Sequence, residues 1–109
     1  MMQALSWTHN LAVIANPRAG KGKASRFADR LQRWLKGAGV SAPLAFTDAA
    51  GHARALAAEL LEHGHTGFVA IGGDGTIHEV ANALASAGKG TLAALPCGNG
   101  NDLARALAI

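Results

Sequence analysis

The stretch Phe68–Val80, FVAIGGDGTIHEV, joins an apolar run to the start of a helical pattern through three glycines and one aspartate. Gly72, Gly73 and Gly75 carry no side chains, so backbone N–H groups there can face a bulky group at close range. Glycine also allows the positive φ of a sharp turn. Asp74 is then the only side chain that the turn presents. We therefore expect a strand, a phosphate-binding turn and a helix.

Thr76 and Glu79 have the spacing of a capping box, in which the hydroxyl caps a free N–H group and the carboxylate reaches back. The GGDG turn would then lie at the positive end of a helix dipole, where phosphate binds favourably. The alternative is a tight turn in which Asp74 is a solvated loop residue, but three glycines exceed what a turn needs. Capping and surface exposure also explain Glu79 and His78 without chemistry.

The same scheme of strand, loop and helix repeats along the whole chain. Apolar runs predict strands at 11–15, 41–46, 68–71 and 91–95. Helices are expected between them, ending near glycines 37, 64 and 88. Their expected inward residues are Phe27, Leu31, Trp34 and Leu35 in the first, Leu56, Ala57, Leu60 and Leu61 in the second (51–63), and Ile77, Val80, Ala81 and Leu84 in the third.

Strands that alternate with helices indicate an α/β fold, here a three-layer, Rossmann-like parallel sheet in one domain of 109 residues. In such sheets ligands bind beyond the carboxyl ends of the strands, where the strand order reverses. Three of the strands end in glycine-rich loops, after Ala15, Ile71 and Pro96. We expect these three loops to build one site.

Positive charge is concentrated near the start of the chain. The formal net charge is only +3, but seven of the ten Lys and Arg are Arg18, Lys21, Lys23, Arg26, Arg30, Arg33 and Lys36. Nucleotide phosphates, nucleic acid or an anionic membrane surface would each suit such a segment. Phe27 and Trp34 are expected in the core rather than stacked on bases, which disfavours nucleic acid.

The loop NPRAGKGKA that opens this segment is neither a P-loop nor a dinucleotide fingerprint. A P-loop needs glycine where Ala15 stands and a hydroxyl where Gly22 stands, and Ser25 replaces the third fingerprint glycine. Lys21 and Lys23 between glycines would still offer charges and backbone donors to a polyphosphate. A basic, solvated loop is the alternative.

The remaining signals are weaker. In PCGNGND, Asn101 or Asp102 suits a helix cap as well as a direct role. His63 and His65 lack a second pair at zinc spacing, and no histidine is tied to Cys97 by pattern, so neither a metal site nor a cysteine nucleophile is expected. A single cysteine suits the reducing cytoplasm. We find no signal peptide or membrane span, so any contact with lipid would be peripheral.

Together the three loops resemble the catalytic domain of the diacylglycerol kinase family, which includes bacterial lipid kinases and sphingosine kinases. The resemblance covers 11–109 and rests on NPxxGKGK, GGDGTxxEV and PxGxxND in that order. It implies ATP-dependent phosphorylation of a lipid hydroxyl with Mg²⁺. Asp74 matches the aspartate that acts in transfer as base or as magnesium organiser.

The resemblance also implies a nucleotide site made from all three loops. Its residues are Asn16, Pro17, Arg18, Gly20, Lys21, Lys23, Gly72, Gly73, Gly75, Thr76, Glu79, Gly98, Asn99, Asn101 and Asp102. One residue departs from the family pattern, since Asn99 stands where Thr or Ser is common. Asp102 fits diacylglycerol kinases and bacterial members better than sphingosine kinases, which usually have Asn-Ala.

Family members continue into a β-rich domain that shelters the lipid. We expect residues 1–109 to be the N-terminal nucleotide-binding domain, inactive alone, with exposed apolar surface that favours self-association. The alternatives are an NAD kinase or phosphofructokinase-like domain, which share GGDG, and a non-catalytic nucleotide- or nucleic-acid-binding module. ATP and a lipid are the expected partners, in the cytoplasm or at its membrane surface, without nucleic acid.

Overall fold

The computed structural model describes residues 10–97 of the chain. Four strands alternate with three helices in the order β1 (Leu11–Ala15), α1 (Lys23–Gly37), β2 (Leu44–Phe46), α2 (His52–Glu62), β3 (Gly67–Gly72), α3 (Asp74–Ala87) and β4 (Thr91–Pro96). The strands pair in parallel in the order β2-β1-β3-β4. The predicted α/β fold with a parallel sheet is confirmed.

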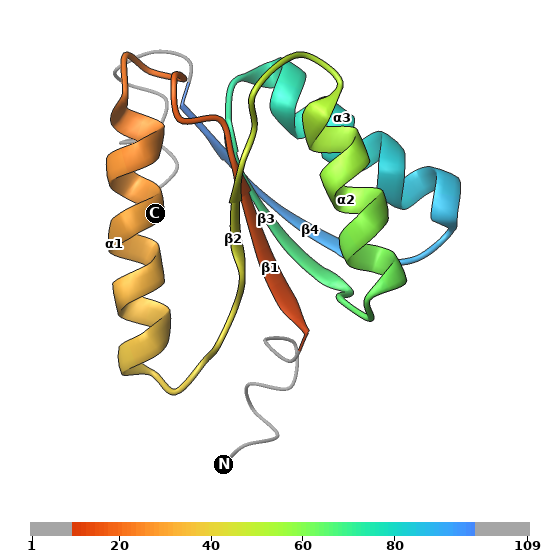
Figure 1. Ribbon diagram of the computed structural model, residues 1–109, viewed down its shortest axis with the longest axis horizontal. Coiled ribbons are helices and arrows are strands. Elements are labelled where there is room, and N and C mark those ends of the chain that lie inside the picture. The colour runs from red at the N-terminus through yellow and green to blue at the C-terminus, as the bar shows by residue number, and fades with distance from the viewer. Residues whose placement is uncertain (1–9, 98–109) are drawn as a thin grey trace.

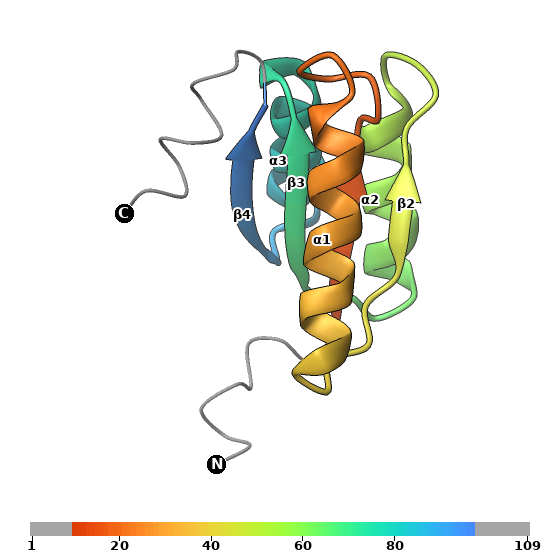
Figure 2. The same cartoon turned by 90° about the vertical axis from the view of Figure 1, so that its left-hand side faces the viewer.

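The sheet lies between two helical layers, with α1 on one face and α2 and α3 on the other (Figures 1 and 2). Successive residues of β1 serve the two faces in turn. Leu11, Val13 and Ala15 belong to the core under α1, whereas Ala12 and Ile14 belong to the core under α2 and α3. Because both faces are covered, β1 reads as an unbroken apolar run.

The helix ends follow the sequence signals closely. Gly88 ends α3 with a left-handed φ of 69°, and its N–H donates to the carbonyl of Leu84 at 2.9 Å. This is the glycine stop that the sequence predicts, because glycine adopts a positive φ without steric cost. The second helix was expected over 51–63 and spans His52–Glu62.

The second strand is shorter than predicted. The expected strand at 41–46 is regular only over Leu44–Phe46. Pro43 has no N–H to donate to a neighbour, although its carbonyl accepts from Val13 N–H at 2.9 Å. Ala42 is buried in the core under α1, and its carbonyl accepts from Gln32 Nε2 at 2.8 Å. Ala42 thus packs toward α1, Pro43 already bonds to β1, and regular pairing begins at Leu44.

Trp34 does not lie in the core, so that prediction is wrong. It is 66% exposed, whereas Ala24, Ala28 and Leu35 are the buried residues of α1. The two alanines bring the helix close to the sheet. Trp34 precedes Leu35, and successive residues of a helix with 3.6 residues per turn point about 100° apart, so Trp34 points away from the core that buries Leu35. Phe27 fits the prediction better, because it is partly buried against this core.

The strand order reverses between β1 and β3. From β1 the chain crosses to β2 on one side, then returns to pair β3 on the other side of β1. The carboxyl ends of these strands meet at one edge, where such sheets bind ligands. No helix among residues 10–97 is long and apolar enough to cross a membrane.

Candidate functional site

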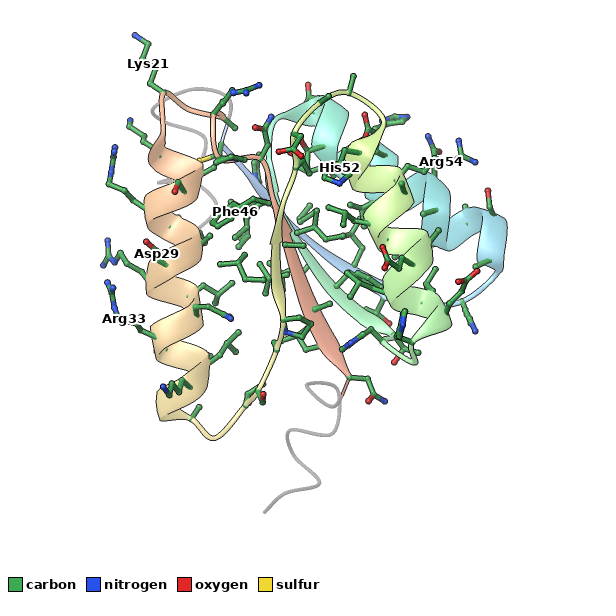
Figure 3. All side chains as sticks on the ribbon, in the orientation of Figure 1. Lys21, Asp29, Arg33, Phe46, His52 and Arg54 are labelled. Atoms are coloured by element: carbon green, nitrogen blue, oxygen red, sulfur yellow. The ribbon has the colours of Figure 1, made fainter. Side chains whose placement is uncertain are left out.

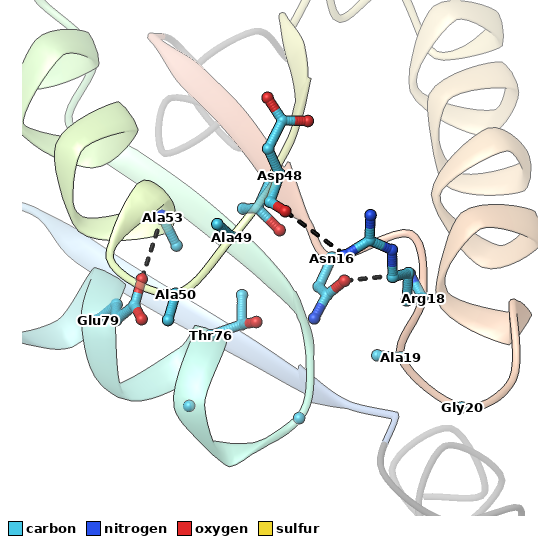
Figure 4. Close-up of a pocket in the computed structure, with 13 residues that line it drawn as sticks. Asn16, Arg18, Ala19, Gly20, Asp48, Ala49, Ala50, Ala53, Thr76 and Glu79 are labelled. Atoms are coloured by element: carbon cyan, nitrogen blue, oxygen red, sulfur yellow. Dashed lines mark hydrogen bonds between the residues drawn. The ribbon is translucent and has the colours of Figure 1, made fainter.

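A pocket of about 470 Å³ opens at this edge, beyond the ends of β1, β2 and β3 (Figure 4). The loop after each of these strands contributes to its wall. The lining residues are Asn16, Arg18, Ala19, Gly20, Thr47, Asp48, Ala49, Ala50, Ala53, Gly73, Gly75, Thr76 and Glu79. The pocket therefore joins two of the three glycine-rich loops that the sequence predicts to build one site.

The loop after β1 is held to the sheet by its asparagine. Asn16 N–H donates to the carbonyl of Ile71 at 2.9 Å, and its side-chain Oδ1 accepts from the N–H of Arg18 at 3.0 Å. Arg18 in turn reaches across the pocket, where Nη1 lies 3.5 Å from the carbonyl oxygen of Asp48 (Figure 4). Among residues 10–97, its guanidinium is the one Lys or Arg side chain in the lining.

Gly20 brings the first loop against the third. Its φ is +63°, and a Cβ built on it would lie 2.5 Å from the carbonyl oxygen of Cys97. Cys97 follows β4, and its N–H donates to the carbonyl of Gly72 at 2.8 Å. The third glycine-rich loop thus begins beside the pocket. Gly98, Asn99, Asn101 and Asp102 lie outside the described residues.

The three glycines of the GGDG turn have two different roles, and neither involves a positive φ. None of Gly72, Gly73 and Gly75 has one, so that part of the prediction is wrong. A Cβ at Gly72 would meet the side chain of Thr76 at 2.9 Å, whereas a Cβ at Gly73 or Gly75 would meet nothing within 4 Å among residues 10–97. Gly72 is therefore needed for packing, and the other two leave the pocket wall bare.

The N-terminus of α3 opens into the pocket without a side-chain cap. Gly73 is its N-cap residue, and no side chain in the described part of the chain accepts from its first turn. The first N–H groups of a helix have no partner within the helix, and they carry the positive end of its dipole. Since Gly73, Gly75 and Thr76 line the pocket, these donors make a site for an anion.

Glu79 does not complete a capping box with Thr76, so this prediction is wrong. Its carboxylate leaves its own helix and caps α2. Oε2 accepts from Gly51 N–H at 2.8 Å, and Oε1 accepts from the N–H groups of Ala53 and Arg54 at 3.1 and 3.3 Å. The residues of α2 itself provide no side-chain cap, because the N-cap residue is Gly51 and the first turn has no acid.

The structure adds a wall that the sequence analysis missed, formed by the loop after β2. Thr47, Asp48, Ala49 and Ala50 line the pocket from this side, together with Ala53 of α2. Thr47 is buried and its N–H donates to the carbonyl of Ala15 at 2.9 Å. A Thr-Asp pair after a strand and before a helix was the available signal. It was overlooked because the loop has no run of glycines.

Several predicted residues lie near the pocket but outside its lining. Asp74 is exposed as the first residue of α3, and Pro17 is half-buried in the first loop. Lys21 and Lys23 are both exposed, and Figure 3 shows Lys21 pointing away from the body of the domain. The backbone of Lys21 has a left-handed φ of 58°. The structure therefore does not bring these lysines to the pocket.

Residues 10–97 contain no group of three or more His, Cys, Asp or Glu side chains that could enclose a metal ion. A Mg²⁺ ion bound to a nucleotide needs less, because in kinases one or two carboxylates hold it together with the phosphates. Asp74 offers one exposed carboxylate beside the uncapped start of α3. The described residues therefore fit an ion that arrives with a polyphosphate, and they do not form a complete metal cage.

Comparison with known proteins agrees with this architecture. Residues 10–109 match the family described as "Diacylglycerol kinase catalytic domain". The chain is 43% identical over 103 residues to sphingosine kinase 1 of Rattus norvegicus, covering 87% of this chain and 27% of that protein. It is 43% identical over 75 residues to a probable lipid kinase YegS-like of Pseudomonas fluorescens, covering 68% of this chain and 25% of that protein.

Solved structures give the same result. A putative diacylglycerol kinase from Bacillus anthracis superposes with a TM-score of 0.72 at 30% identity, covering 91% of this chain and 36% of that one. The chain spans about a quarter of the length of the curated relatives named above. From the family match over almost its whole length, this chain belongs to the diacylglycerol kinase catalytic domain family.

Proposed function

We propose that this chain is the nucleotide-binding N-terminal domain of a lipid kinase, which transfers the γ-phosphoryl group of ATP to a lipid hydroxyl. Family membership supports the reaction class. The pocket at the carboxyl edge of the sheet supports the placement of the nucleotide, because it unites the loops after β1, β2 and β3.

The uncapped start of α3 is the observation that carries the proposal. Its free N–H groups face a pocket whose wall is bare at Gly73 and Gly75. Neither glycine is required by a positive φ or by a neighbouring side chain. Room for a ligand explains both, because phosphate oxygens can approach the backbone only where no Cβ intervenes. The β- and γ-phosphates would bind here.

Glu79 gives the nucleotide its orientation. The N-terminus of α2 also borders the pocket, but the carboxylate of Glu79 already accepts from three of its N–H groups. A negative group at this end repels phosphate. The phosphates would therefore lie toward α3 and Arg18, and the nucleoside toward the wall made by Thr47 to Ala50.

Asp74 is the proposed catalytic residue. It stands at the first position of α3, next to the donors that would hold the phosphates, and it is exposed to a partner from outside the domain. Phosphoryl transfer has a loose transition state and depends mainly on positioning and on charge neutralisation. Asp74 would orient the lipid hydroxyl and accept its proton, or hold Mg²⁺. Mg²⁺ would supply neutralisation of phosphate charge.

The balance of the reaction is simple. The lipid hydroxyl oxygen forms a bond to the γ-phosphorus, the bond from that phosphorus to the β-γ bridging oxygen breaks, and ADP leaves. The hydroxyl proton passes to Asp74 or to solvent. The domain that shelters the lipid would follow this one in the longer protein, so residues 1–109 alone should bind nucleotide weakly and transfer no phosphate.

The experiment supplies the full-length protein with γ-labelled ATP, Mg²⁺ and parallel acceptors: diacylglycerol, sphingosine, phosphatidylglycerol, NAD and fructose 6-phosphate. Label in a lipid that disappears with Asp74→Asn would support the proposal. Label in NAD or sugar phosphate would instead assign a related kinase activity. Nucleotide binding without transfer to any acceptor would favour a non-catalytic binding module.

A further inference from the structure

The outer face of α1 gathers positive charge that the pocket does not use. Its exposed cations are Lys23, Arg26, Arg30, Arg33 and Lys36, and Asp29 is the exposed acid of the same helix. Figure 3 shows the Arg33 side chain on the side of α1 that faces away from the sheet. None of these cations lines the pocket at the carboxyl edge.

These positively charged side chains lie next to one another on the surface of α1. Lys23, Arg26, Arg30 and Arg33 follow one another at intervals of three or four residues, which places them side by side along a helix. None of the five forms an ion pair with any residue in the described part of the chain. Like charges at this spacing destabilise a helix, so an anionic partner would stabilise α1.

Trp34 borders this outer face on the side of Arg30. It is 66% exposed, and it follows Arg30 by four residues, so the indole and the guanidinium are neighbours on the helix surface. Indole rings favour the boundary between water and lipid headgroups, where the ring is apolar and its N–H stays hydrated. A helix with buried alanines on one side and arginines beside tryptophan on the other has the character of an interfacial helix.

The shape of this surface favours a membrane over nucleic acid. α1 has 15 residues, so its outer face is a ridge about 22 Å long. Single strands bind in grooves in which several aromatic rings stack on successive bases. This ridge presents one aromatic ring among five cations, which suits a flat, negatively charged surface.

We propose that the outer face of α1, made of Lys23, Arg26, Arg30, Arg33, Trp34 and Lys36, docks the protein on an anionic lipid surface. Trp34 lies at the level of the headgroups, and the arginines contact their phosphates. The choice of lipid rests on the proposed function, because a kinase for lipids must meet its acceptor at a membrane. The loop that precedes α1 lines the pocket, so docking holds the pocket near that membrane.

The test measures co-sedimentation of the full-length protein with vesicles, without nucleotide or acceptor. Vesicles of phosphatidylcholine alone are compared with phosphatidylcholine mixed with phosphatidylglycerol. We expect binding only to the mixed vesicles, weakened by salt because exposed charges are screened. Each Lys or Arg near such a surface contributes about fivefold to partitioning, so Arg30→Glu with Arg33→Glu should reduce binding more than about twentyfold.

Two further variants distinguish binding through the outer face of α1 from nonspecific attraction between the protein's positive charge and the vesicles. Lys89→Glu reverses a single charge at an exposed site after α3, the helix on the opposite face of the sheet from α1, and should reduce binding less than about twofold, whereas Arg30→Glu alone should reduce it more than about fivefold. Trp34→Ala should reduce binding severalfold, and it should remove the part of the tryptophan fluorescence that brominated lipid quenches in the wild type. Circular dichroism should show that each variant remains folded, as expected for exposed positions.

Equal vesicle binding by the Arg30/Arg33 variant and the wild type would overturn the proposal. So would binding to single-stranded RNA without binding to mixed vesicles, and so would the absence of any vesicle binding by a folded wild type, as when another part of the protein covers α1. A protein that binds vesicles through this face and phosphorylates no acceptor would contradict the proposed function alone.

Discussion

Glu79 on α3 holds the first turn of α2 through its backbone, with Oε1 of Glu79 3.1 Å from the N–H nitrogen of Ala53. Its other oxygen accepts from Gly51 at 2.8 Å. One carboxylate therefore supplies the cap that α2 lacks in its own sequence and ties two neighbouring helices together. Since the loop before α2 forms a wall of the pocket, this contact also sets the shape of the site.

Removing this carboxylate should weaken both the fold and the site. We expect Glu79→Ala to lower the free energy of unfolding by about 1–2 kcal/mol, as for the loss of a helix cap with a charged acceptor. Urea denaturation measures this change, and calorimetry with an ATP analogue should show weaker binding. Glu59→Ala changes an exposed Glu of α2 and should alter neither quantity appreciably. Equal effects of the two substitutions would contradict the capping role.

Gly75 allows stability and binding to be changed in opposite directions. It lies in the first turn of α3, where an alanine Cβ would meet nothing within 4 Å. Gly75→Ala should therefore stabilise the helix by up to about 1 kcal/mol. The added methyl group would occupy the pocket wall, so affinity for nucleotide should fall at least about tenfold.

Gly37→Ala is the matched control for this substitution. Gly37 is the last residue of α1, also has nothing within 4 Å of a Cβ, and does not line the pocket. It should change stability in the same direction and leave nucleotide affinity unchanged. Unchanged affinity in Gly75→Ala would place the phosphates elsewhere.

Gly20 should tolerate no side chain. Its φ is +63°, and a Cβ would lie 2.5 Å from the carbonyl oxygen of Cys97. We expect Gly20→Ala to cost about 2–4 kcal/mol, from the left-handed backbone and the overpacked contact together. Gly39→Ala has a similar φ of +82° with open space around it, so it should show the backbone cost alone. If Gly20→Ala and Gly39→Ala lowered the melting temperature equally, the loops after β1 and β4 would have moved apart to accept the methyl group at position 20.

Asp74→Asn should separate binding from chemistry. The residue is exposed at the first position of α3, where asparagine fits without disturbing the helix. We expect nucleotide affinity to remain within a fewfold of the wild type, and phosphoryl transfer by the full-length protein to fall at least about a hundredfold. Transfer of label from ATP to lipid measures the second quantity. Substantial residual transfer would remove Asp74 from the proposed mechanism.

The order of elements was readable from the sequence because it depends on local chemistry. Apolar runs made β1, β3 and β4, glycine ended α3, and a bare GGDG turn led into a helix at the ligand-binding edge. Alternation of strands with helices was enough to predict the parallel sheet, since a crossover helix must connect parallel strands. We expected three glycine-rich loops to meet there for the same reason, and the first two line the pocket.

Tertiary structure decided where single side chains go. Sequence spacing paired Glu79 with Thr76 on one helix, yet the carboxylate caps α2, because an uncapped helix start lies beside it in space. Trp34 shares a helical pattern with Leu35, but two small alanines set how α1 sits on the sheet and leave the indole outside. The wall after β2 enters the site only through the strand order.

Local patterns thus determined which elements form and at which edge of the sheet the pocket lies. The packing of one helix against another decided which residues line that pocket. The physical reason is that a pattern fixes the direction of a side chain relative to its own helix or strand, whereas its partner depends on what that face meets after folding.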